Sequence, residues 1–161
     1  MLESIEFEGT FPMGRTSKLL CMFYALVAVA ALYGTWSENL QYGSPATAGA
    51  QFLTDLKVNP ASRSISIDLS LFLLAASVWM VLEARRIGLR FVWAYVVFAF
   101  LVAISVTFPL YLLAREIRLA SPAPVATPSR LVVVLDYAGL AIVSALLGSL
   151  SIWLHGAASR L

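Results

Sequence analysis

Long runs of hydrophobic residues separated by shorter polar stretches dominate the chain. Four such runs lie at residues 19–36, 67–82, 91–114 and 131–154. A helix needs roughly 20 mainly apolar residues to cross the hydrocarbon core of a bilayer, and each run reaches or approaches this length. The runs are continuous and do not alternate with polar residues, which favours helices over the strands of a membrane barrel. The chain is therefore predicted to be all-α, an integral membrane bundle of four helices.

The second helix is expected to begin before its apolar run does. Asn59 and Pro60 form a strong start signal, because Asn caps the free N–H groups of a first turn and Pro needs no hydrogen bond there. A helix over residues 60–87 would be about 42 Å long at 1.5 Å per residue, so it would project beyond the hydrocarbon at both ends. In the third run, Pro109 removes one helical hydrogen bond and predicts a kink.

The connections between the runs divide the chain into four parts. Residues 1–18 form an N-terminal segment, whose acidic start is unlike a signal peptide, so the first run is predicted to be a retained helix. A three-span unit at 19–120 contains a long loop at 37–61, in which residues 48–56 predict a short helix on the membrane surface. Three prolines mark 121–130 as an extended linker. The fourth span and a short tail, 131–161, therefore look appended.

Composition supports a membrane environment. Hydrophobic residues make up 60% of the chain and charged residues 12%, whereas soluble domains average about 45–50% and about 25%. So few charges leave too little polar surface to face water, and the lipid bilayer is the expected surrounding. The net charge of +2 is too small to suggest nucleic-acid binding.

Basic residues indicate the orientation only weakly. If the N-terminus is cytoplasmic, six lie on that side and five on the other, namely Arg15, Lys18, Arg85, Arg86, Arg90 and Arg160 against Lys57, Arg63, Arg115, Arg118 and Arg130. The dense group Arg85, Arg86 and Arg90 favours both termini in the cytoplasm. These three arginines are also candidate contacts for lipid headgroups.

The sequence contains no signature of a cofactor, a metal site or a familiar catalytic site. Its single cysteine, Cys21, cannot form a thiolate metal cage, and its single histidine, His155, cannot supply bis-histidine haem ligation. No phosphate loop, dinucleotide fingerprint, nucleophile elbow or zinc-protease motif occurs. We therefore expect no metal and no cofactor, and a non-enzymatic role is favoured.

Two aspartates, Asp68 and Asp136, lie inside the apolar runs, where a charge costs about 2.5–3.5 kcal/mol on insertion scales. With four spans, the second and fourth helices run in parallel, so both aspartates fall in the same half of the bilayer. One membrane face is then expected to gather a charge cluster of Glu38, Arg63, Asp68, Arg115, Glu116, Arg118 and Asp136. The aspartates either pair with arginines to hold the helices or, as buried acids, carry protons in catalysis or transport. Separately, Glu83 and Arg86 are three residues apart and are expected to pair.

The fourth run carries small residues at helical spacing, namely Ala141, Ser144, Ala145, Gly148 and Ser149. Small residues four apart let another helix approach closely. This surface serves either packing within the chain or docking on a membrane-protein partner or a second copy.

Three blocks occur in order: N-P-A-S-R-S-I-S-I-D-L at 59–69, W-M-V-L-E-A-R-R-I-G at 79–88 and F-P-L-Y-L-L-A-R-E-I-R-L at 108–119. They resemble a family of small bacterial membrane proteins known only as a domain of unknown function. The resemblance covers residues 19–120 and implies a compact three-helix unit in the bacterial cytoplasmic membrane. It implies no activity, and the fourth span departs from it.

Three functions are compatible with these features. The favoured one is a non-enzymatic accessory or assembly subunit of a larger membrane complex, or a homo-oligomer, with the fourth span as the docking helix. An alternative is a membrane enzyme that acts on an isoprenoid or another lipid, with Asp68 or Asp136 as general acid. The third is a small proton-coupled transporter that uses the same aspartates.

Overall fold

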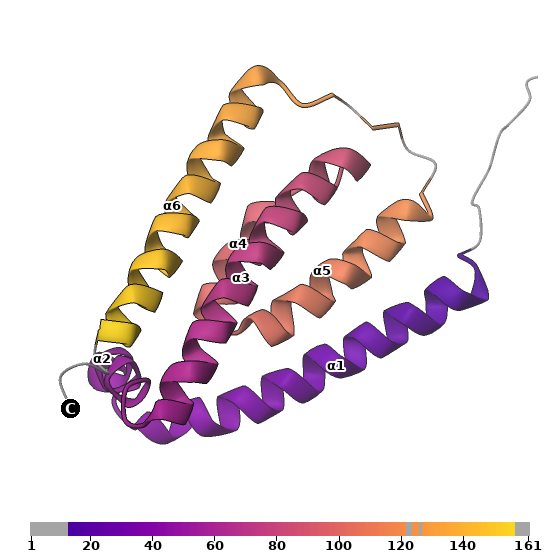
Figure 1. Cartoon of the computed structure of the whole chain (residues 1–161). Helices are drawn as coiled ribbons and strands as arrows, with labels where there is room; N and C mark the ends of the chain where they lie inside the picture. The colour runs from indigo at the N-terminus through magenta and orange to yellow at the C-terminus, as the bar shows by residue number, and fades with distance from the viewer. Residues whose placement is uncertain (1–12, 122–123, 126, 157–161) are drawn as a thin grey trace, which may run out of the picture.

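The computed structural model describes residues 13–121, 124–125 and 127–156, and every regular element in them is helical. The elements are α1 (Arg15–Asn39), the short 3-10 helix η1 (Leu40–Tyr42), α2 (Pro45–Asp55), α3 (Pro60–Ile87), α4 (Val92–Leu101), α5 (Ile104–Leu119) and α6 (Arg130–Gly156) (Figure 1). The predicted all-α class is confirmed.

Three stretches of helix are long and apolar enough to cross a membrane: α1 continued through η1, α3, and α6. Helix α3 has the bounds that its start signal predicts. The Asn59 side chain accepts a hydrogen bond from the Ser62 N–H at 2.8 Å, and Pro60 occupies the first turn. Gly88 ends the helix in a left-handed conformation, with φ +70°, which glycine adopts at little cost.

The third apolar run is not one helix. Helix α4 ends at Leu101 and α5 begins at Ile104, with Ala103 in an extended conformation between them. The ring centroids of Tyr95 and Tyr111 lie 5.6 Å apart, whereas sixteen residues of continuous helix would separate them by about 24 Å. Helices α4 and α5 therefore fold back on each other as a hairpin. The predicted bundle of four continuous spans is not confirmed, because the described residues hold three span-length helices and this hairpin.

Contacts with α3 hold the hairpin in its reversed form. Tyr111 is fully buried and donates a hydrogen bond to the Met80 carbonyl at 3.0 Å. The Phe108 ring lies against the rings of Phe72 and Trp79. These contacts place α5 beside α3 and parallel to it, so α5 ends at the same end of the bundle as α3 does. Neither glycine nor proline lies at the break, and Pro109 is inside α5.

Helix α6 runs antiparallel to α3 (Figure 1). Near its start, Asp136 contacts Arg85 at the end of α3. Near its end, the Trp153 ring lies 3.6 Å from the Lys57 ammonium group, just before α3 begins. The predicted parallel arrangement of the second and fourth apolar segments is therefore wrong. Its cause is the hairpin, which returns the chain to the end of α3 before α6 starts.

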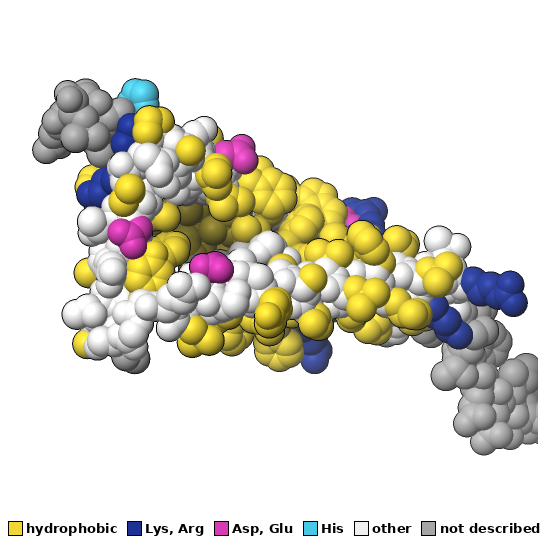
Figure 2. All heavy atoms as spheres, turned by 90° about the horizontal axis from the view of Figure 1, so that it is seen from below, with side chains coloured by type: hydrophobic (Ala, Val, Ile, Leu, Met, Phe, Trp, Pro, Cys, Tyr) yellow, Lys and Arg dark blue, Asp and Glu magenta, His cyan; other side chains and the backbone are white. Residues whose placement is uncertain are grey.

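The buried core lies where α3, α4, α5 and α6 meet, and α1 packs along α5. Core side chains include Met80, Val81, Val96, Tyr111 and Leu147. Large hydrophobic side chains are exposed on the face that Figure 2 shows. Among the exposed hydrophobic residues, Leu26 of α1 is 67% exposed. An apolar exterior of this kind suits helices that lie in lipid.

Candidate functional site

Asp136 is the central residue of the contact between α6 and the rest of the bundle. Its carboxylate accepts hydrogen bonds from Arg85 Nε at 2.6 Å and from Arg85 Nη2 at 2.8 Å. The indole Nε1 of Trp93 donates a third at 2.9 Å. The three residues come from α6, α3 and α4, so one buried carboxylate joins three helices. The two-pronged contact with Arg85 is the stronger and more directional kind of ion pair.

A glycine allows the tryptophan to reach this carboxylate. A Cβ atom at Gly139 would lie 2.3 Å from Cη2 of Trp93, which is closer than real Cβ atoms approach. The absence of a side chain at Gly139 therefore lets the indole ring approach the backbone of α6 closely, less than one turn from Asp136.

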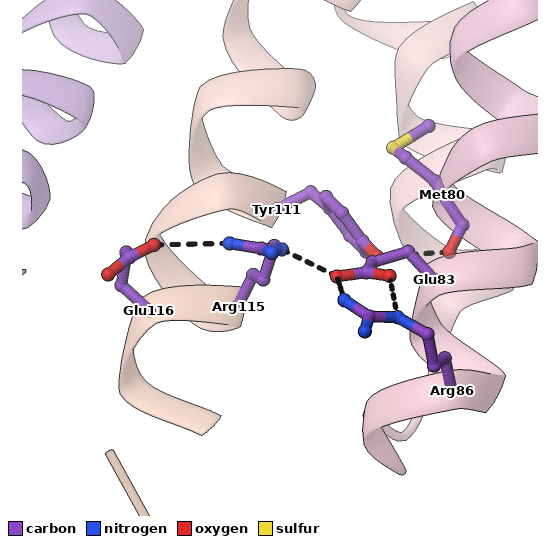
Figure 3. A network of polar contacts seen from close by, with 6 residues as sticks. All are labelled: Met80, Glu83, Arg86, Tyr111, Arg115 and Glu116. Carbon is purple, nitrogen blue, oxygen red and sulfur yellow. Dashed lines mark hydrogen bonds and ion pairs between the residues drawn. The ribbon is translucent and has the colours of Figure 1, made fainter. Parts of the chain in front are cut away.

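A second network surrounds Glu83 near the end of α3 (Figure 3). Arg86 donates two hydrogen bonds to the Glu83 carboxylate, at 2.6 and 2.7 Å. Arg115 of α5 donates a third to the same carboxylate at 2.8 Å, and it also reaches Glu116 at 3.2 Å. The predicted Glu83–Arg86 pair is confirmed, and it is part of a larger set that ties α5 to α3.

In both networks the carboxylate has hydrogen-bond partners within the protein. Asp136 and Glu83 are buried, at 6% and 8% exposure. Within the described residues, no buried side-chain nitrogen or oxygen lacks a hydrogen-bond partner. A buried charge is tolerated when it is paired and hydrogen-bonded. The arrangement therefore supports a role for these residues in holding the helices together.

The cluster of seven charged residues predicted for one membrane face does not form. Arg115 and Glu116 join the Glu83 network, and Asp136 joins Arg85. Arg118 donates to the Gly88 carbonyl at the end of α3. All of these lie at the end of the bundle where α3 finishes, because α5 returns there and α6 starts there.

The other three predicted members lie toward the opposite end. Glu38 accepts a hydrogen bond from Gln41, and Arg63 donates one to the Lys57 carbonyl. Asp68 is exposed and makes no hydrogen bond or ion pair with any residue that the structure describes. The two aspartates singled out by the sequence therefore have different surroundings, one paired and one not.

The three arginines predicted to meet lipid headgroups differ as well. Arg85 is engaged with Asp136, and Arg86 is engaged with Glu83 although its side chain is 67% exposed. Arg90 is exposed and makes no hydrogen bond or ion pair with the described part of the chain.

The small residues of α6 lie away from the protein interior. Ala141, Ser144, Ala145 and Ser149 are exposed and Gly148 is half-buried, whereas Val143, Leu147 and Leu154 of the same helix are buried. The hydroxyls of Ser144 and Ser149 donate to carbonyls of their own helix. This stripe therefore does not pack against the other described helices.

Sequence reasoning missed the two partners of Asp136. Trp93 is not among the candidate residues selected from the sequence, and Arg85 is selected only as a lipid headgroup contact. The available signal was the cost of an acid in an apolar run, which demands a basic partner.

In the described part of the chain, no group of three or more His, Cys, Asp or Glu side chains is placed to hold a metal ion.

A family model described as "Protein of unknown function DUF2834" matches residues 23–117. The matched range includes Glu83, Arg85, Trp93 and Arg115 but ends before α6 and Asp136. No curated protein and no solved structure matches the chain.

Proposed function

We propose that this chain, which belongs to the DUF2834 family, is a non-enzymatic accessory or assembly subunit in the bacterial cytoplasmic membrane. It associates through α6 with a larger membrane complex or with a second copy of itself. The proposal goes beyond the family, whose description gives no function.

The outer face of α6 carries this proposal. One side of the helix packs on α3 through Val143 and Leu147, while the small residues on other sides of the helix stay exposed. Lipid provides no hydrophobic driving force between helices, so close packing at small residues is a main source of association energy. The polar atoms of the stripe are satisfied within α6, so it needs no water around it.

The polar contacts of Asp136 argue against the enzyme alternative. A general acid must hold a proton and release it to the substrate. Asp136 instead accepts three hydrogen bonds, two of them from a guanidinium that favours the charged carboxylate. This arrangement suits an anchor between helices rather than a proton donor.

Crosslinking in native membranes tests the association. A single cysteine would replace Ala145 on the stripe in a Cys21→Ser background, and a matched variant would carry it at Leu26, an exposed position on α1. We expect a membrane-permeant crosslinker that carries a maleimide and a photoreactive group to give adducts of the Ala145 variant in preference to the Leu26 variant. An adduct of twice the chain mass indicates self-association, and any other mass indicates a partner.

A companion measurement uses size in mild detergent. Ala145→Phe should shift the complex toward the monomer, because the added ring blocks close approach, whereas Leu26→Phe should not. A wild-type protein that runs as a lone monomer and gives no adduct from Ala145 overturns the proposal.

Asp68 favours proton-coupled transport as a second candidate function. It is exposed on α3, eight residues after Pro60 and so about 12 Å along the helix. Carboxylates within membrane-spanning segments mark proton relays in pumps and transporters. If the protein works this way, the Asp68→Asn variant should fail to complement a deletion of its gene that the wild-type protein complements. Full restoration by Asp68→Asn removes this candidate.

A further inference from the structure

A cavity of about 520 Å³ lies where α3 ends and α6 begins. Its polar lining comes from Arg85, Arg90 and Arg118 together with Ser121 and Thr127. Leu89, Pro128 and Val132 supply apolar wall. A volume of this size is typical of small-ligand sites, and basic groups beside apolar walls suit an amphipathic anion.

The three guanidinium groups that line the cavity have different polar surroundings. Arg85 is held by Asp136, which balances its charge. Arg118 donates to the carbonyl oxygens of Gly88 and Pro124, both at 3.4 Å, and these bonds position it at the rim. Arg90 makes no polar contact with the residues described. Guanidinium groups bind phosphate oxygens through their fixed fork of N–H donors.

The close fit of Gly88 helps to place Arg118 in the cavity. A Cβ atom at this position would lie 3.2 Å from Arg118 Nη2 and 3.2 Å from Val125 Cγ1. The glycine ends α3 and at the same time leaves room for the guanidinium and for the linker that follows α5.

The position of the cavity in the fold points to the membrane as the source of its ligand. Helix α1 ends beside the start of α3, so its own start lies at the cavity end of the bundle (Figure 1). Eight of the eleven basic residues therefore gather at this end: Arg15, Lys18, Arg85, Arg86, Arg90, Arg115, Arg118 and Arg130. Lys57 and Arg63 lie at the other. Such an excess marks the cytoplasmic face, where anionic lipids carry phosphate at the depth of the helix ends.

We propose that this cavity binds the phosphate headgroup of an anionic membrane lipid, with Arg90 as the phosphate ligand, Arg118 as a further positive charge at the rim, and the apolar wall against the glycerol and upper acyl chains. The site is independent of the stripe on α6, so it does not rest on the association proposed above. The arginines that line this cavity differ from the three predicted from the sequence, Arg85, Arg86 and Arg90. Arg86 pairs with Glu83, and Arg118 lines the cavity instead.

Native mass spectrometry of the full chain, titrated with phosphatidylglycerol in detergent, tests this site. Arg90→Gln is the informative variant, because the Arg90 side chain is exposed and makes no hydrogen bond or ion pair with the described residues. Arg15→Gln is the matched control, since Arg15 lies at the same end of the bundle, outside the cavity. We expect Arg90→Gln to lower the retained lipid about fivefold, as the loss of one basic contact near a membrane surface does, and Arg15→Gln to leave it unchanged.

Phosphatidylcholine and soluble glycerol phosphate provide the other two arms of the experiment. Phosphatidylcholine should be retained less than phosphatidylglycerol, and millimolar glycerol phosphate should not displace the bound lipid. Equal losses in Arg90→Gln and Arg15→Gln overturn the site. Displacement by glycerol phosphate overturns the lipid as ligand and assigns the cavity to a soluble phosphate ester.

Discussion

Arg85 and Asp136 are 51 positions apart and form a two-pronged ion pair, with N–O distances of 2.6 and 2.8 Å. Arg85 lies inside the range that matches the family model, and Asp136 lies outside it. The pair is therefore a direct polar connection between the region that matches the family model and α6.

Neutralising this carboxylate should weaken the docking of α6. Asp136→Asn removes the charge that balances Arg85 and is expected to lower the free energy of unfolding by about 2 kcal/mol, typical of a lost charged hydrogen bond. Unfolding in mixed micelles with increasing dodecyl sulfate measures the change. Asp68→Asn is the control and should have little effect, since Asp68 is exposed and makes no hydrogen bond or ion pair with a described residue.

The combination with Arg85→Gln sharpens this test. The loss of unfolding free energy in the double variant should be smaller than the sum of the losses in the two single variants, because each single change leaves one charge unpaired. Strict additivity would show that the pair does not stabilise the docked helix.

Adding a methyl group at Gly139 should disrupt the same contact by a different route. Gly139→Ala places a Cβ atom 2.3 Å from the Trp93 ring, so the indole must move and its hydrogen bond to Asp136 must lengthen or break. We expect a lower unfolding midpoint and a shift in tryptophan emission. Gly34→Ala on α1 serves as the control, because its added Cβ would meet no atom within 4 Å and Gly34 lies outside the stripe on α6. Equal behaviour of the two variants would contradict the close packing of Trp93 on α6.

The tyrosine hydroxyl inside the bundle should matter more than one on its surface. Tyr111→Phe deletes the donor to the Met80 carbonyl in a fully buried site, and we expect a loss of about 1 kcal/mol. Tyr33→Phe changes a side chain that is 79% exposed and should be neutral. Thermal unfolding in detergent compares the two, and an unchanged Tyr111→Phe would argue against the α3–α5 contact.

The reversed hairpin predicts an unusual membrane topology. Arg90 and Ser121 flank the α4–α5 hairpin, so both should face the same side of the membrane, and Ser44 should face the other. Single cysteines at the three positions, in a Cys21→Ser background, can be labelled with a membrane-impermeant maleimide from either side. A continuous span over residues 91–114 would instead put Arg90 and Ser121 on opposite sides.

Local signals in the sequence predict individual helices well. Asn59, Pro60 and Gly88 mark the ends of α3 because each acts on the backbone within a few residues. The spacing of Glu83 and Arg86 likewise determines their pairing within one helix. These features depend on neighbours along the chain, which a sequence displays directly.

The direction of each helix depends on distant contacts and was not predictable in this way. No glycine or proline marks the reversal at Ala103, and the contacts that hold it involve Tyr95, Tyr111 and Met80. Once that reversal is missed, every later helix is assigned the opposite direction. This single error explains the predicted charge cluster, the parallel second and fourth segments and the even split of basic residues.

The hairpin also changes what α6 does for the rest of the polypeptide. If α1, α3 and α6 each cross the membrane, the hairpin returns the chain so that the start of α1 and the end of α5 face one compartment. Helix α6 then starts in that compartment, and its last turn, around Trp153, faces the other. The start of α6 and its last turn would therefore be accessible from opposite sides of the membrane.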